Sequence, residues 1–70
     1  MTLDADDIKR IARKIDKFCT DQNIRDHEIA VSILDVICAA HYGLTASEAL
    51  GPVSPAYLKR VIHYANKVQS

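Results

Sequence analysis

The sequence lacks the features that mark several large classes of protein. It has two cysteines, too few for a disulfide framework, so we expect both thiols to stay reduced in the cytoplasm. No run reaches ~18 apolar residues, which argues against a membrane span. Three acidic residues stand where a secretory leader needs its apolar run: Asp4, Asp6 and Asp7.

An excess of charge of one sign is also absent. Nine Lys and Arg balance nine Asp and Glu, so the chain has neither a basic arm nor an acidic tail. Its 70 residues predict a single domain over 1–70. A chain this short buries only about 60% of its unfolded surface. Because 49% of its residues are hydrophobic, we expect self-association to help cover them.

Capping signals and apolar periodicity predict four helices, over residues 4–21, 26–42, 45–50 and 54–68. Asp4 with Asp7, and Thr45 with Glu48, have the spacing of capping boxes. Pro55 suits the first position of the last helix. We therefore expect an all-α fold, a compact bundle of three main helices plus one short helix.

The predicted second helix, residues 26–42, is apolar around most of its circumference. Its polar side chains form only a narrow strip: Glu28, Ser32 and Asp35. At ~100° per residue the apolar arc exceeds 200°, and such a helix must be surrounded. A compact monomer can achieve this, but we favour a symmetric homodimer. Its candidate interface residues are Ile33, Val36 and Ile37.

A helix-turn-helix pattern occurs in the second half of the chain. Residues 44–51 read LTASEALG and residues 53–60 read VSPAYLKR. Over residues 44–62 this resembles the short helix, glycine turn and recognition helix of bacterial transcription regulators of the AraC type. The resemblance implies that four residues of the last helix face DNA: Lys59, Arg60, His63 and Lys67. Cations without acids suit phosphate contacts, but a solvated amphipathic helix presents the same face.

Residue types for metal binding and catalysis are present without the required arrangement. Four side chains are possible metal ligands: Cys19, His27, Cys38 and His41. They lack the two tight ligand pairs of structural zinc sites, and a cysteine in an apolar run usually packs as a small hydrophobe. The chain has no glycine-rich loop and no nucleophile elbow. We expect no metal, no cofactor and no enzymatic activity.

The sequence therefore favours a small non-enzymatic regulatory protein that binds a larger protein as an inhibitor or adaptor. Phages and mobile elements encode many such proteins, and a transcription regulator is one class of target that fits. The alternative is a DNA-binding transcription regulator that uses the 54–68 helix. The loop after the first helix supplies recognition candidates: Ile24, Arg25, Asp26 and His27. Ile24 has a second interpretation, in which it folds back over the core.

Overall fold

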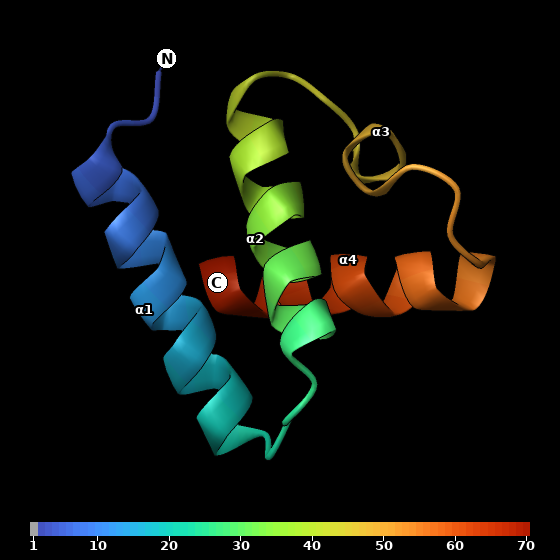
Figure 1. Cartoon of the computed structure of the whole chain (residues 1–70), viewed down its shortest axis with the longest axis horizontal. Coiled ribbons are helices and arrows are strands. Elements are labelled where there is room, and N and C mark those ends of the chain that lie inside the picture. The colour runs from blue at the N-terminus through green and yellow to red at the C-terminus, as the bar shows by residue number, and fades with distance from the viewer. Residues whose placement is uncertain (1) are drawn as a thin grey trace.

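The computed structural model describes residues 2–70, and this part of the chain contains helices and no strand. The four helices are α1 (Ala5–Asp21), α2 (His27–His41), α3 (Ala46–Leu50) and α4 (Pro55–Gln69) (Figure 1). Each begins and ends within one residue of its predicted bounds, and the all-α fold class is confirmed. None of the helices within residues 2–70 has both the length and the apolar character of a membrane span.

Side-chain caps fix the starts of α1 and α3. The Asp4 carboxylate accepts a hydrogen bond from the Asp7 backbone N–H at 2.8 Å, and the Asp7 carboxylate accepts one from the Asp4 N–H at 3.1 Å. Thr45 and Glu48 form the same reciprocal pair. Hydrogen bonds from the Thr45 backbone and hydroxyl lower the pKa of Glu48. Both predicted capping boxes are therefore confirmed.

The chain changes direction after α1 and again after α2, each time through a residue with positive φ. Asn23 has φ +57° after α1, and Gly43 has φ +76° after α2. Beyond Asn23, the Ile24 backbone N–H donates to the Cys19 carbonyl at 2.8 Å, as in a Schellman motif. This turn directs Ile24 against the hydrophobic core, so the interpretation in which it folds back over the core is confirmed.

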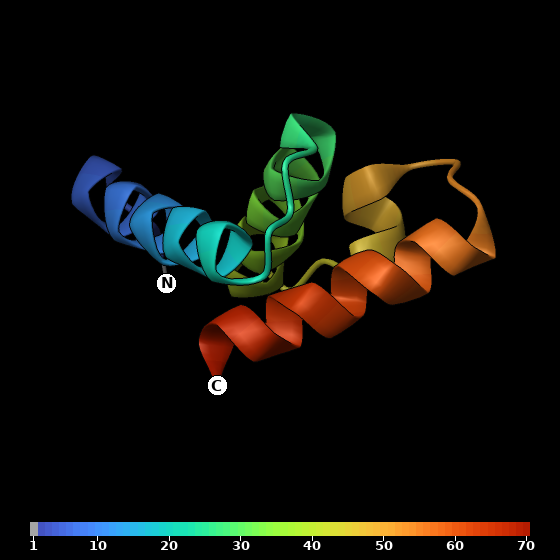
Figure 2. The same cartoon turned by 90° about the horizontal axis from the view of Figure 1, so that it is seen from below.

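The other three helices surround α2. α1 lies beside α2 and runs roughly opposite to it, while α4 crosses behind α2 and its C-terminal end reaches towards α1 (Figures 1 and 2). α3 sits next to the second half of α2, on the side away from α1 (Figure 1). α2 packs against each of the other three helices. The wide apolar arc of this segment is therefore covered mainly by helices of its own chain.

The core is formed around the inner side of α2. Ile33 is 0% exposed and Ile37 is 2% exposed, and both lie in one buried cluster with Val61 of α4. Val36 belongs to the same cluster. The three residues expected at a dimer interface are thus already buried within one chain and need no second copy to cover them. The homodimer stays a prediction, and its interface would have to use other side chains.

Gly51 shapes the connection between α3 and α4. Its φ of +69° and ψ of −152° lie in a region that only glycine adopts readily. The chain after α3 is therefore extended and does not continue as a helix. This extended connection places Val53 in the lining of a groove beside α2, before α4 begins at Pro55.

Two substitutions on α2 test where the core lies. Ile33→Asp should unfold the protein, because losing a large buried side chain costs about 2–5 kcal/mol and a buried carboxylate adds a desolvation penalty. The total stability of a chain this long is only about 4–10 kcal/mol. Val31→Asp, two residues away, should remain folded because Val31 is 56% exposed. Far-UV circular dichroism and thermal melting distinguish the two, and an unfolded Val31→Asp variant would contradict this assignment of the core.

Candidate functional site

A shallow groove of about 660 Å³ lies between α2 and the segment formed by α3 and the start of α4. Its apolar lining comes from both sides: Val31, Ala49, Leu50, Val53 and Tyr57. Its polar lining is concentrated on α2, with one residue from the start of α4: His27, Glu28, Ser32, Asp35 and Ser54. We call this surface the α2–α3 groove.

A second hollow of about 210 Å³ lies on the other side of α2, between α2 and α1. We call it the α1–α2 hollow, and its lining residues are Ala12, Ile15, Asp16, His27, Ala30, Val31 and Leu34. Val31 and His27 line both depressions. The two depressions therefore form one surface, with Val31 on the ridge between them.

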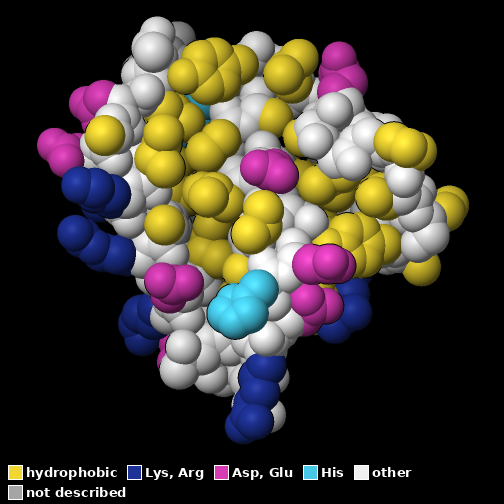
Figure 3. All heavy atoms as spheres, in the orientation of Figure 1, with side chains coloured by type: hydrophobic (Ala, Val, Ile, Leu, Met, Phe, Trp, Pro, Cys, Tyr) yellow, Lys and Arg dark blue, Asp and Glu magenta, His cyan; other side chains and the backbone are white. Residues whose placement is uncertain are grey.

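Hydrophobic side chains dominate this face of the molecule. Figure 3 shows them gathered over α2 and towards α3, with acidic side chains among them and Lys and Arg at the edges. Val31 is the most exposed large hydrophobic residue of the described chain. Exposed apolar surface that is contiguous and rimmed by polar groups is typical of interaction sites.

The charged groups of this face are carboxylates. Glu28 and Asp35 line the groove, Asp16 lines the hollow, and no Lys or Arg lines either one. Within residues 2–70, neither Glu28 nor Asp35 has a salt-bridge partner. The charge on this face is therefore negative. On the same helix, burial raises the pKa of the Cys38 thiol, and the charge of Asp35 raises it further.

The hydroxyl groups of the groove are all engaged in hydrogen bonds within the chain. Ser32 Oγ and the Tyr57 hydroxyl share a hydrogen bond of 2.8 Å, which ties α2 to α4. The Ser54 hydroxyl oxygen accepts a hydrogen bond from the Tyr57 backbone N–H at 3.2 Å and caps α4. With these hydroxyls engaged, the carboxylates of Glu28 and Asp35 are the strong acceptors left for a ligand.

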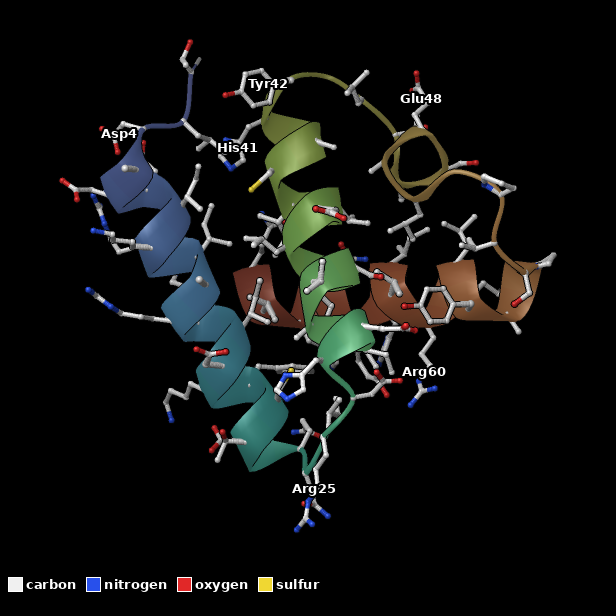
Figure 4. All side chains as sticks on the ribbon, in the orientation of Figure 1. Asp4, Arg25, His41, Tyr42, Glu48 and Arg60 are labelled. Atoms are coloured by element: carbon white, nitrogen blue, oxygen red, sulfur yellow. The ribbon has the colours of Figure 1, made fainter. Side chains whose placement is uncertain are left out.

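The four cationic candidates of α4 are exposed, and none of them lines the groove. Arg60 is held against its own helix: its Nε donates to the Tyr64 hydroxyl at 3.3 Å, and its Cζ lies 5.7 Å from the Tyr64 ring centroid (Figure 4). Lys59, His63 and Lys67 are exposed without a salt-bridge partner among the described residues. The structure therefore brings these residues together, with Arg60 the least free of the four.

The four loop candidates line one small hollow of about 190 Å³ at the start of α2, but their side chains have different roles. Ile24 packs on the core, and Asp26 caps α2 by accepting a hydrogen bond from the Glu28 backbone N–H at 2.9 Å. Arg25 points away from the molecule at the tip of the loop (Figure 4), where its Nε donates to Asn23 Oδ1 at 3.3 Å. His27 is the one of the four that lines the α2–α3 groove.

Sequence reasoning missed most of the groove. Val31 follows Glu28 by three residues and precedes Asp35 by four, so it lies beside the polar strip of α2. That spacing was a signal that Val31 faces outward. Leu50, Val53 and Tyr57 carry no comparable signal, because only the packing of α3 and α4 brings them beside α2.

The described part of the chain contains no cluster of metal-binding side chains. Within residues 2–70, no three His, Cys, Asp or Glu side chains are grouped so that they could hold a metal ion.

No protein-family model, curated protein or solved structure matches the chain. The shape and charge of the exposed faces are therefore what indicate a function.

A double-mutant cycle tests the hydrogen bond that closes the floor of the groove. Tyr57→Phe should lower the free energy of unfolding by about 1 kcal/mol, because it leaves the half-buried Ser32 hydroxyl without its partner. Ser32→Ala should cost a similar amount. The double variant should cost clearly less than the sum, since both changes remove one interaction. Denaturant titration measures all three, and strict additivity would show that the two hydroxyls are not bonded.

Proposed function

We propose that the protein is a small non-enzymatic regulator that binds another protein through the α2–α3 groove, as an inhibitor or adaptor. The observation that carries this proposal is the exposed apolar surface around Val31, which remains uncovered after α2 has packed against the other three helices. Leaving such a side chain in water forgoes part of the roughly 1.5–3 kcal/mol that its full burial contributes. A bound protein surface would recover it.

The shape of the groove supports a macromolecular partner. Sites for small molecules enclose 70–90% of their ligand's surface, whereas this groove is shallow and open to solvent. It also continues across Val31 into the α1–α2 hollow. A ligand that covers both depressions has to be broad, as a segment of a folded protein is.

Site-specific photo-crosslinking tests the proposal. With p-benzoylphenylalanine in place of Val31, ultraviolet light should yield a crosslinked product of defined mass in the native host cells. The same group in place of Arg13, exposed on α1, should yield little. Mass spectrometry identifies the crosslinked protein, and the adduct should form again when the two purified proteins are mixed. Equal labelling from both positions, or no product from position 31, would contradict binding through this face.

Binding of duplex DNA by α4 is the second candidate, and the observation in its favour is the exposed cationic side of that helix. Lys59, His63 and Lys67 are exposed, and the sequence of α4 contains no acidic residue. α3 and α4 are joined by a short connection and packed on α2, which is an arrangement that a helix-turn-helix requires.

Salt-dependent titration tests this second candidate. The protein should bind a fluorescent duplex of random sequence at ~50 mM salt and lose affinity steeply as salt rises. Lys59→Ala or Lys67→Ala should weaken binding and reduce the slope of log K against log salt by about 1, as expected for one lost phosphate contact. Lys9→Ala on α1 is the matched control and should change nothing. An absence of binding at the lowest salt would remove this candidate.

A further inference from the structure

We infer that the segment which occupies the α2–α3 groove is a cationic amphipathic helix of the partner, with Lys or Arg at positions i and i+7 and large apolar residues between them. This inference rests on the proposed function and specifies the chemistry of the partner at the same site.

The charge of the groove requires a cation from its occupant. Glu28 and Asp35 stand seven residues apart on α2, which is about two helical turns or ~10 Å along its axis. Val31 lies between them, and neither carboxylate has a salt-bridge partner within the chain's described residues. An apolar segment without cations would bring both carboxylates into a drier environment uncompensated, which is unfavourable.

The backbone of the occupant is helical because the groove offers little to an extended chain. Residues 2–70 contain no strand, so no sheet edge is present to pair with a peptide. Ser32 and Tyr57 are already bonded to each other. A helix satisfies its own backbone N–H and C=O groups, whereas an extended segment on this apolar floor would leave many of them without partners.

The spacing of the occupant's side chains follows from that of α2. A helix laid along α2 has the same rise of ~1.5 Å per residue. Cations at i and i+7 then reach Glu28 and Asp35 together, and apolar residues at i+3 and i+4 contact Val31 and the floor beside Leu50. This is the pattern of a helix that places an apolar stripe in a groove.

A second copy of this chain does not meet these requirements. Two-fold pairing through this face would bring the carboxylates of both copies together, and like charges in contact are unfavourable. The chain's own cationic helices also lack the pattern. Between Arg60 and Lys67 the residue at i+3 is His63. The residue at i+4 is Tyr64, which is half-buried and already engaged by Arg60. Between Arg10 and Lys17 the residues at i+3 and i+4 are both cations, Arg13 and Lys14. Neither face therefore offers large apolar side chains at both positions between its two cations.

Synthetic peptides test the inference directly with the full chain. The probe is a fluorescent peptide of about 18 residues, long enough for substantial helix in water, built from Ala, Leu and Lys with Lys at i and i+7 around Leu at i+3 and i+4. One control has the same composition with the lysines moved to the opposite face. A second control carries Glu in place of Lys. Fluorescence anisotropy should show the probe binding at least ~10-fold more tightly than either control.

Matched protein variants locate the binding. Asp35→Lys should lower the affinity for the probe by about fivefold or more, because it turns an attraction at the groove into a repulsion. Asp6→Lys makes the same change of charge at an exposed position of α1 and should leave binding unchanged. Val31→Asp should also weaken binding, and circular dichroism confirms that each variant is folded.

The outcomes separate this inference from the proposed function. A probe that binds no better than its controls, or an Asp35→Lys variant that binds it equally well, overturns the cationic helix. If position 31 still crosslinks to a protein whose labelled segment is acidic or extended, the proposed function holds and only the inferred cationic helix is wrong. If position 31 crosslinks to nothing, the proposed function itself fails. A basic, helical labelled segment supports both.

Discussion

The structure depends on covering α2, a helix that is apolar around most of its circumference. Residues 2–70 form only three other helices, and α2 packs against all of them. They exclude water from its inner side, where Ile33 and Ile37 lie, but leave Val31 exposed. The position of α2 at the centre and the apolar surface on its outer side are thus two consequences of the same composition.

The groove arises from a difference in length between α2 and the helix beside it. α2 has 15 residues, about 22 Å, whereas α3 has five, about 8 Å. α4 is long enough to flank α2, but it crosses behind it (Figures 1 and 2). One flank of α2 is therefore covered over only part of its length. Gly51 contributes, because its extended conformation carries the chain outward before α4 begins.

The helices could be predicted from the sequence because their signals are local. Asp4 and Thr45 start their helices through contacts with residues three positions away. The side of α2 that faces the core could not be predicted in the same way, since almost every side of this helix is apolar. Ile33 and Ile37 were expected at an interface for this reason, although they form the core. The groove depends on where α3 and α4 pack, which no local pattern encodes.

The net charge of zero conceals a separation of charge between faces. Carboxylates line the groove on α2, and cations occupy the exposed side of α4. At physiological salt, charges more than about one Debye length of ~8 Å apart are largely screened from each other. A ligand on either face therefore responds mainly to the charges nearest to it. A balanced total charge is unusual for a DNA-binding domain, but a ligand at α4 responds to the charge of that face.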